Sequence, residues 1–587
     1  MEKYHQNVQT NNILLDGGLE FHLAKGLDFM VKGSYNVKKS TDNKFVALGL
    51  KGATDAENFA TIGNSESVRW SNEDYFTYKN TFFDGKLKSD FVLGASWYYY
   101  NYESTSLQAN GISEELFEYH NVGTGTNPRG SSSDYDHITM NSFYFRTNQV
   151  FLDRYMLGIT LRADGASNFG DNNKYGFFPS ASAAWDISRE PWFKMKDVNQ
   201  LKLRLSYGAV GNSSIGTYKT FAQYSSGTIY MDGVSNAYVT LANLANKDLS
   251  WETIKQFDAG LDIALWNDRV NIVADYYIKD SENLLFNKTV PYTTGYSSTS
   301  MNIGKLRNRG FELTINTHII DNKDFKWDLD YIWSTNKCIA VDLIDDPFTN
   351  GASNSAVRAY KGEEFCSWYV FHRTGTWSTD EIEEAAVYGR HPGDPKWEDV
   401  NGDGQYTYDD RYQYGNMLPH GEMTLVNTFF WNGFTASIDF GGMYGFYVFN
   451  HHAAVQETNF GCNNTTAANL KAWTPYNQNT MIPALRTTSD DNAGTYYGNE
   501  IDDWWVERGD FVRLRNVSLS YDFGHKVLKK SKAISGLVLG VNVENAYLFT
   551  NYSGYDPEMG DCNDLTPAVI GSYPKPMVIT GNLKITF

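Results

Sequence analysis

The most constraining feature of this sequence is an alternation of apolar and polar residues that recurs along the chain and continues to its last residue. In the last run, Ile579, Leu583, Ile585 and Phe587 fall on one face, and Thr580, Asn582, Lys584 and Thr586 fall on the other. This period of two is that of a β-strand with one apolar and one polar face. A terminal strand that no other element covers leaves an unpaired edge, which a closed barrel removes by pairing the last strand with the first. We therefore expect an all-β barrel.

The same alternation occurs in many other parts of the chain. Runs of this kind lie at 157–162, 201–207, 257–265, 270–276, 311–316, 327–334, 434–440, 507–523 and 537–549. Any one of them could be a strand of a β-sandwich with one solvated face. Together they place charged residues on one face and none on the other, which favours a water-filled lumen and a lipid-facing exterior.

The connections between these runs alternate between short turns and long polar segments. Short connections are predicted at Lys25–Gly26, Asp84–Gly85, Leu152–Asp153, around Pro191, and at Asn267–Asp268, Asp321–Asp324, Asn432–Gly433 and His525–Ser535. Long ones are predicted at Lys38–Ser65, Ser104–Asp136, Ala209–Ser250, Asn336–Glu422 and Gly442–Glu507. In outer-membrane barrels the turns are periplasmic and the loops are extracellular. The eight short connections predict about 17 strands of an antiparallel, multi-pass transmembrane β-barrel of the outer membrane.

An odd number of strands does not make a complete single-chain bacterial barrel. The first predicted strand, Gly17–Ala24, should run from the outside toward the periplasm. Large plugged transporters have about 22 strands, so the first five strands are expected to be absent from this chain. Met1 is followed at once by polar residues with no signal peptide, which an exported barrel needs. We therefore expect the gene product to begin upstream of Met1.

Composition agrees with a barrel and excludes other classes of protein. Aromatic residues make up 15% and hydrophobic residues 41% of the 587 residues, and the mean hydropathy is −0.46. No apolar run is long enough to predict a transmembrane helix. The net charge of −19 argues against a nucleic-acid partner. The four cysteines (Cys338, Cys366, Cys462 and Cys562) are far apart, which favours isolated thiols over a metal or redox site.

Several segments carry a resemblance to a known family. They are YGFFPSASAAW (Tyr175–Trp185), LKLRLSYGAVGN (Leu201–Asn212), LSWETIKQFDAGLD (Leu249–Asp262), NIGKLRNRGFELTIN (Asn302–Asn316), GDPKWEDVNGDG (Gly393–Gly404), GDFVRLRNVSLSYDF (Gly509–Phe523) and VENAYLFTNYSGYDPEMG (Val543–Gly560). In this order they are similar to segments of SusC/RagA-type TonB-dependent outer-membrane transporters. The family's plug domain, TonB-contacting segment and signal peptide have no counterpart in the sequence. The resemblance therefore assigns residues 1–587 to the C-terminal part of a transporter barrel, incomplete at its N-terminal side.

The resemblance implies an importer of large nutrients, namely glycans or oligosaccharides and possibly peptides. A SusD-like surface lipoprotein would bind at the extracellular loops, and TonB would act on a plug that this chain lacks. This polypeptide is therefore not expected to transport by itself. Two alternatives stay open: a passive porin, and a soluble or secreted multi-domain β-protein that binds carbohydrate.

One motif predicts a metal site. Residues Asp399 to Asp410 match the twelve-residue calcium loop, with oxygen ligands from Asp399, Asn401 and Asp403, a glycine at position six, the backbone carbonyl of Gln405 and the carboxylate of Asp410. Position twelve is Asp rather than Glu and no flanking helices are predicted, so an EF-hand proper is excluded. The alternative is a cluster of Asx turns that binds no ion. We expect Ca²⁺ here, with Mg²⁺ as the lesser candidate, and no organic cofactor.

Nothing in the sequence predicts an enzyme. HExxH and GxSxG motifs are absent, and the pair His451–His452 has no third ligand at motif spacing. The carboxylates of Asp258, Asp262, Asp275 and Asp330 could form glycosidase pairs but are more typical of a solvated pore lining. Aromatic pairs at Tyr98–Tyr100, Trp368–Tyr369 and Trp504–Trp505 could stack on sugar rings, although packing within girdles or loops is the more frequent role. The substrate-binding residues are therefore left unassigned.

Overall fold

Seventeen strands form one antiparallel sheet, which confirms the predicted all-β fold and the predicted number of strands. The computed structural model describes residues 4–49, 57–231, 233–296, 298–343, 356–458, 464–485, 501–525, 534–559 and 573–587. The sheet consists of β1–β8, β11, β12, β15, β16, β22, β23 and β26–β28. Within these residues, the helices are too short or too polar to cross a membrane. Cys462 and Cys562 lie outside the described residues, and Cys338 and Cys366 are buried.

The chain divides into two compact units. Unit 1 comprises Met1–Trp185, Leu205–Gln256 and Ser281–Ile303, and unit 2 comprises Asp186–Arg204, Phe257–Asp280 and Gly304–Phe587. Three strands have residues in both units, namely β8 (Val198–Asn212), β11 (Glu252–Leu265) and β12 (Val270–Glu282).

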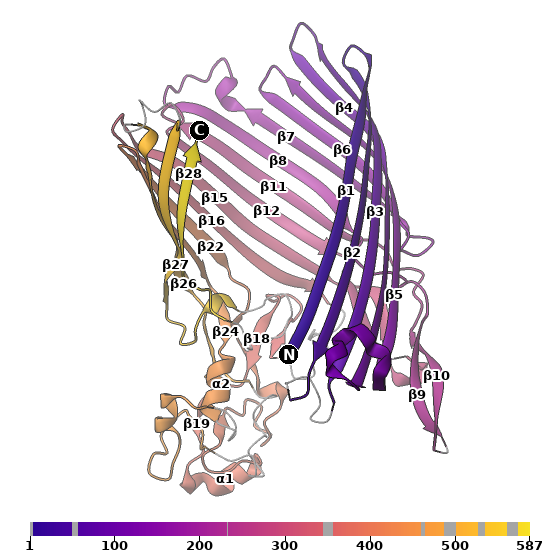
Figure 1. Cartoon of the computed structure of the whole chain (residues 1–587). Coiled ribbons are helices and arrows are strands. Elements are labelled where there is room, and N and C mark those ends of the chain that lie inside the picture. The colour runs from indigo at the N-terminus through magenta and orange to yellow at the C-terminus, as the bar shows by residue number, and fades with distance from the viewer. Residues whose placement is uncertain are drawn as a thin grey trace. The chain divides into compact units, whose positions relative to one another are not determined.

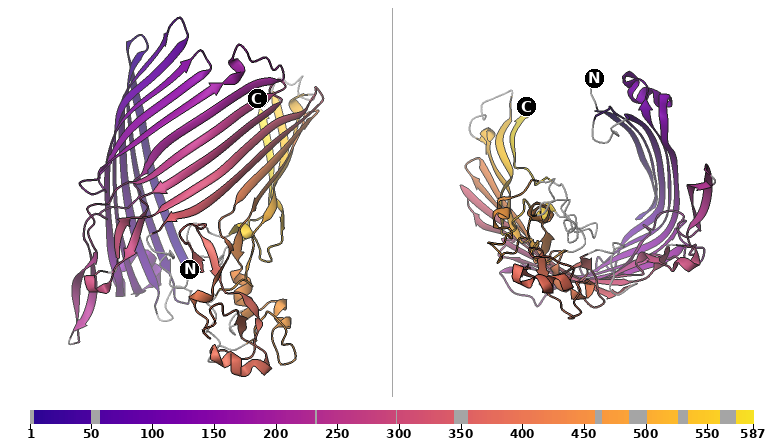
Figure 2. Two further views of the ribbon diagram at one scale, coloured as in Figure 1. Left: turned by 180° about the vertical axis from the view of Figure 1, so that it is seen from behind. Right: turned by 90° about the horizontal axis from the view of Figure 1, so that it is seen from below.

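Unit 1 is built from long hairpins whose strands lie side by side in chain order (Figure 1). Its strands are β1 (Tyr4–Ala24), β2 (Leu27–Val46), β3 (Phe59–Phe82), β4 (Leu87–Ile112), β5 (Gly125–Phe151), β6 (Tyr155–Ala166) and β7 (Tyr175–Asp186). The two views in Figure 2 show the same order as a continuous run of colour from indigo to magenta. A smaller sheet contains β9 (Gln223–Met231), β10 (Val234–Asn243), β13 (Leu285–Thr289) and β14 (Ser298–Asn302).

The hairpins of unit 1 are longer than the sequence predicts. Segments 38–65 and 104–136 were expected to be loops, but β2 pairs with β3 as far as Val46↔Phe59, and β4 pairs with β5 as far as Ile112↔Gly125. Beyond the apolar part of each strand, polar cross-strand contacts replace the alternation that marks a strand in the sequence. Lys39 forms an ion pair with Glu66 at 2.9 Å, and the hydroxyls of Thr10 and Ser40 lie 3.0 Å apart. Such pairs stabilise a hairpin without an apolar face.

Unit 2 continues the sheet with β15 (Lys305–Asp321), β16 (Phe325–Asp342), β22 (Gly421–Trp431), β23 (Phe434–Tyr444), β26 (Phe511–Asp522), β27 (Gly536–Thr550) and β28 (Val578–Thr586). Each strand pairs antiparallel with the next in this order. Its other strands are β17 (Val357–Arg358), β18 (Ser367–Val370), β19 (Arg373–Thr376), β20 (Pro395–Trp397), β21 (Tyr412–Asn416), β24 (Tyr447–Phe449) and β25 (Val506–Arg508). Its α-helices are α1 (Ile382–Val387) and α2 (His451–Thr458).

Short 3-10 helices complete the described elements. They are η1 (Glu115–Thr124) and η3 (Tyr292–Thr294) in unit 1, and η2 (Ile187–Arg189), η4 (Thr379–Glu381), η5 (Tyr408–Asp410), η6 (Ala467–Lys471), η7 (Phe523–His525) and η8 (Pro557–Met559) in unit 2.

The first and last strands of the sheet are highly exposed. In unit 1, β1 pairs with β2 and is exposed at nearly every position. In unit 2, β28 pairs with β27 and is exposed at every position. These strands have the exposure expected of sheet edges.

The tight turn between β1 and β2 provides a test of the fold. Gly26 has φ of +77°, and a Cβ there would lie 2.1 Å from the carbonyl oxygen of Lys79. Gly85, in the turn between β3 and β4, has φ of +91° and open space around it. We expect Gly85→Ala to lower the free energy of unfolding by about 1 kcal/mol, because alanine disfavours the left-handed backbone. Gly26→Ala should lower it by about 1–3 kcal/mol more, because the new Cβ also collides with the Lys79 carbonyl oxygen. Thermal unfolding in detergent, followed by circular dichroism, measures both; equal losses would contradict the packing at Gly26.

Candidate functional site in the loop domain

Two long connections of unit 2 fold together into one compact region. We define the loop domain as residues 356–420, 445–458, 464–485 and 501–510, which lie in the connections from β16 to β22 and from β23 to β26. Pairings within the first connection join β18 to β17 and β21, and β19 to β20. A bridge between Phe371 and Asp502 joins the first connection to the second. The loop domain is therefore folded, in contrast to a set of independent loops.

An aromatic core holds the loop domain together. Its buried members are Ala356, Val357, Cys366, Trp368, Val370, Phe371, Trp397, Met417, Phe449, Ala454, Trp505 and Val506. Trp368 is 1% exposed, and its indole N–H donates to the carbonyl of Tyr447 at 3.0 Å. Trp368, Tyr369 and Trp505 are all buried, so these three aromatic residues pack inside the domain, as the more frequent role predicts. Trp504 is 39% exposed and is the member of these pairs that keeps an accessible ring.

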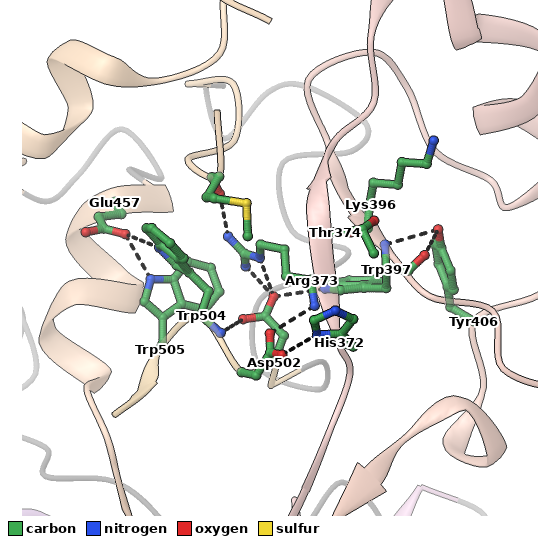
Figure 3. A network of polar contacts seen from close by, with 12 residues as sticks. His372, Arg373, Thr374, Lys396, Trp397, Tyr406, Glu457, Asp502, Trp504 and Trp505 are labelled. Carbon is green, nitrogen blue, oxygen red and sulfur yellow. Dashed lines mark hydrogen bonds and ion pairs between the residues drawn. The ribbon is translucent and has the colours of Figure 1, made fainter. Parts of the chain in front are cut away.

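A buried ion pair joins the two connections at the centre of the core (Figure 3). Arg373 and Asp502 are both fully buried, and the Arg373 Nε–H donates to Asp502 Oδ2 at 2.6 Å. The indole N–H of Trp397 donates to the same oxygen at 2.9 Å. Arg373 also donates to the carbonyl of Met481 at 2.8 Å and lies over the ring of Trp505 at 4.0 Å. Burial raises the pKa of Asp502, and Arg373 opposes that shift.

Two further carboxylates organise the aromatic residues around this pair. Asp503 accepts hydrogen bonds from the backbone N–H of Arg373 at 2.9 Å and from the hydroxyl of Tyr412 at 2.8 Å. Glu457, on α2, accepts the indole N–H groups of both Trp504 and Trp505, at 3.1 and 3.0 Å. Figure 3 shows Glu457 beside the two indoles, on the opposite side of Asp502 from Trp397. The exposed ring of Trp504 is thus held in place through Glu457.

The predicted metal loop lies in the first connection, between β20 and β21. Asp399 accepts the backbone N–H groups of Gly402 at 2.7 Å and Gly404 at 2.9 Å. Hydrogen bonding from Gly404 is the main reason that the pKa of Asp399 lies below its ordinary value. The hydroxyl of Tyr388 donates to the same carboxylate at 3.1 Å. Asp399 therefore fixes the first half of the loop through its own backbone.

The remaining predicted ligands also take part in hydrogen bonds within the loop. Asp410 is fully buried and accepts the backbone N–H groups of Val400 at 3.0 Å and Thr407 at 2.8 Å. Asn401 and Asp403 are exposed, and each accepts the backbone N–H two residues later. Among the described residues, Glu20, His22 and Asp28 form a group of three possible metal ligands whose ligand atoms all lie within 4.8 Å of one another. The carboxylates of the predicted metal loop do not meet this distance, so they are not gathered around one point.

This geometry fits an all-oxygen donor set but not a closed coordination sphere. The side-chain oxygens of Asp399, Asn401, Asp403 and Asp410 come from one short loop, together with the carbonyl of Gln405. Asp399 Oδ1 and Asp403 Oδ1 each accept one backbone N–H and keep a second lone pair. Asp399 Oδ2 and both oxygens of Asp410 already accept two hydrogen bonds each. An ion would have to draw the three loop carboxylates closer together.

The other candidate residues of the sequence make structural contacts. Arg204 donates to Asp262 at 2.9 Å and to Asp275 at 3.1 Å, so these two carboxylates share one guanidinium. Asp330 accepts from the amide of Asn316 at 2.7 Å. His451 and His452 lie in α2, with their rings 6.5 Å apart. The sequence did not predict the Arg373–Asp502 pair, because partners 129 positions apart leave no local pattern.

Comparison with known proteins identifies the class of protein. The family model described as "TonB dependent receptor-like, beta-barrel" matches residues 2–546. The chain therefore belongs to the β-barrel family of TonB-dependent receptors, which are outer-membrane proteins and not enzymes.

Relatives agree with this family over most of the chain. TonB-dependent receptor P3 of Formosa agariphila is 30% identical over 587 residues, covering 97% of this chain and 57% of that protein. TonB-dependent receptor SusC of Bacteroides thetaiotaomicron is 28% identical over 480 residues, covering 76% of this chain and 44% of that protein. The chain thus spans about half the length of these relatives.

A solved structure shows the same fold. The structure of the RagAB peptide transporter matches with a TM-score of 0.81 and 21% identity, over 95% of this chain and 60% of that chain. This agreement extends the resemblance to SusC/RagA-type proteins from sequence segments to the arrangement of the strands.

The buried ion pair yields a test of the loop domain. Asp502→Ala leaves Arg373 buried without its counter-charge, and we expect it to destabilise the loop domain by about 3–5 kcal/mol. Arg373→Met combined with Asp502→Leu removes both charges and should be closer to the wild type. Limited proteolysis in urea, read at sites within the loop domain, measures the difference.

A surface pair provides the matched control. Asp342 and Lys361 form an ion pair at 2.9 Å, and both side chains are more than half exposed. Asp342→Ala should leave the stability close to that of the wild type, because solvent screens an exposed ion pair. If Asp502→Ala has an effect no larger than Asp342→Ala, the ion pair does not hold the loop domain together.

Proposed function

We propose that this chain is the barrel part of a TonB-dependent outer-membrane importer of large nutrients. Glycans or oligosaccharides are the first candidates, and peptides are the second. Membership in the receptor family is the observation that carries the proposal. The relative named SusC and the fold shared with the RagAB peptide transporter support it.

The loop domain would face the outside of the cell, where a SusD-like lipoprotein would bind. In outer-membrane barrels the long connections are extracellular and the short turns are periplasmic. The loop domain consists of described residues from two long connections. Its buried ion pair holds these connections together, so the domain offers a rigid surface. A rigid surface binds a partner with less loss of conformational entropy than a flexible one. The short turns, such as that at Gly26, would lie on the periplasmic side.

The described strands would form part of a barrel of about 22 strands. A plug domain and five further strands would come from sequence outside these 587 residues, and TonB would act on that plug. The exposure of β1 in unit 1 and of β28 in unit 2 supports this proposal, because both strands are free to accept another strand.

Two alternatives are distinguished by specific observations. A passive porin would keep the strands but would need no energy input. A soluble carbohydrate-binding β-protein would need no detergent, and membership in an outer-membrane family counts against it. The alternation of apolar and polar residues on many strands is also typical of a barrel with a lipid-facing side.

Uptake in the native organism tests the proposed function. Cells that lack the full-length gene should fail to grow on one or more members of a panel of oligosaccharides and peptides, and the gene should restore growth. Uptake should stop when a protonophore collapses the energy that TonB uses, whereas a porin would continue to pass its solute. Unchanged growth on the whole panel, or a protein that stays soluble without detergent, would refute the importer.

We also propose that the Asp399–Asp410 loop binds Ca²⁺. The all-oxygen donor set and the lowered pKa of Asp399, which keeps that carboxylate charged, support the proposal. Calcium tolerates irregular oxygen coordination, whereas Mg²⁺ demands a near-octahedral site. Extracellular calcium modules bind with Kd of about 10⁻⁴–10⁻³ M, which is sufficient outside cells. The bound ion would make the loop domain more rigid beneath a partner lipoprotein.

Proteolysis with and without chelator tests the calcium loop. Asp399→Ala combined with Asp403→Ala should make the loop domain more sensitive to protease and abolish its response to chelator, while the sheet stays folded. Glu383→Ala combined with Glu384→Ala is the matched control, because these exposed carboxylates on α1 lie outside the motif. If the wild-type protein is digested identically with Ca²⁺ and with chelator, the loop is a cluster of Asx turns without an ion.

A further inference from the structure

A pocket lies between two neighbouring short turns of unit 2. One turn joins β15 to β16 at residues 322–324, and the other joins β22 to β23 at residues 432–433. Because β16 and β22 pair from Phe325↔Trp431 onward, the two turns lie side by side. The pocket has a volume of about 460 Å³ and extends to Asp522 at the end of β26. On the proposed function, on which this inference rests, these turns lie at the periplasmic surface of the outer membrane.

A row of aromatic residues borders the pocket. Cross-strand partners share a face, and the pairings Phe325↔Trp431, Trp431↔Phe434 and Phe434↔Tyr521 place one row of rings across β16, β22, β23 and β26. The ring centroids of Trp431 and Phe434 are 6.1 Å apart, and Trp431 is 59% exposed. Aromatic residues of a membrane barrel gather at the level of the lipid headgroups. The pocket therefore lies at the height where a headgroup joins its acyl chains.

The pocket carries charged side chains of both signs. Lys323 and Asp324, in the first turn, line it and are exposed. Within the part of the chain that the structure describes, the side chains of these two residues form no hydrogen bond or ion pair with the protein. Asp522 accepts one backbone N–H, at 2.8 Å. Lys326, by contrast, is neutralised by Asp321 at 2.8 Å. One ammonium group and two carboxylates without a counter-charge thus border the same pocket.

We propose that this pocket binds the headgroup of a zwitterionic phospholipid with a primary ammonium group, that is, phosphatidylethanolamine. The lipid phosphate accepts hydrogen bonds from Lys323, and the lipid ammonium donates to Asp324 and Asp522. Hydrogen bonds between charged groups are about twice as strong as those between neutral groups. The acyl chains lie along the exposed rings of Trp431 and Phe434. The periplasmic leaflet of an outer membrane consists of phospholipids, so such a headgroup is present at this level.

The charges of the pocket select among phospholipids. Phosphatidylglycerol carries the phosphate but no ammonium group, so it would leave Asp324 and Asp522 without a donor and repel them. Phosphatidylcholine carries both charges, but methyl groups replace the N–H donors, so the carboxylates would gain charge neutralisation without hydrogen bonds. Phosphatidylethanolamine should therefore bind best, phosphatidylcholine less well and phosphatidylglycerol least.

Native mass spectrometry of the full-length protein tests this order. The protein in detergent is mixed with equal amounts of the three lipids, all with the same acyl chains. Lys323→Gln combined with Asp324→Asn should lower the affinity for phosphatidylethanolamine about tenfold, because charge-assisted hydrogen bonds are lost. Lys88→Gln combined with Asp153→Asn is the matched control and should leave it unchanged, because these residues beside two other short turns neutralise each other. Equal binding of the three lipids, no bound lipid, or an equal loss in both variants would overturn the proposal.

A reversal of charge tests the role of the carboxylates. Asp324→Lys replaces an acceptor for the lipid ammonium by a second donor for the lipid phosphate. The ratio of bound phosphatidylglycerol to bound phosphatidylethanolamine should therefore rise about tenfold. A substitution that merely loosened the turn would weaken the binding of both lipids alike, and an unchanged ratio would contradict the assigned contacts.

Two further measurements separate this inference from the proposed function. Resistance of the protein to carbonate extraction measures membrane insertion, and nutrient uptake measures transport. A protein that inserts and transports but binds the three lipids equally would overturn only the headgroup site. A protein that does not insert would refute the barrel itself.

Discussion

The structure depends on the backbone hydrogen bonds between neighbouring strands. A strand has no internal partner for its N–H and C=O groups, so each must find one on the strand beside it. In lipid no water is available for this, and an unpaired group costs several kcal/mol. The long hairpins of unit 1 and the consecutive pairing of β15 to β28 in unit 2 both follow from this requirement. The polarity of the side chains then determines which face of the sheet suits lipid and which suits water.

The loop domain is organised by a different kind of interaction. Its elements are too short to be stable alone, and the strands β19, β20 and β24 contain only three or four residues each. Buried aromatic rings and the Arg373–Asp502 pair replace the missing length. A buried pair of charges contributes little net stability over an apolar pair, but it strongly disfavours any arrangement that separates the charges. The pair therefore specifies which connection packs against which.

Local patterns in the sequence predicted the parts of the fold that local physics determines. Alternation and turn residues identified the strands, because both act over a few positions, as at Gly26 and at Asn432–Gly433. The outer parts of the hairpins were missed since Thr10 and Ser40 pair through polar groups and show no apolar face. The Arg373–Asp502 pair was missed because its partners meet only in the folded chain. The Asp399–Asp410 motif was visible because its groups are close in sequence, although spacing alone does not show whether an ion is bound.

The long separation of Arg373 and Asp502 has a consequence for the order of folding. Between them in the chain lies the hairpin of β22 and β23, which must leave the first connection and return to the second. Closing so long a loop has an entropic cost, which falls once that hairpin has formed and brought the two connections together. The core of the loop domain must therefore assemble after this part of the sheet. Until then the core tryptophans (Trp368, Trp397 and Trp505) are exposed to solvent. A chain that stops folding at this stage would therefore expose aromatic rings to which chaperones can bind.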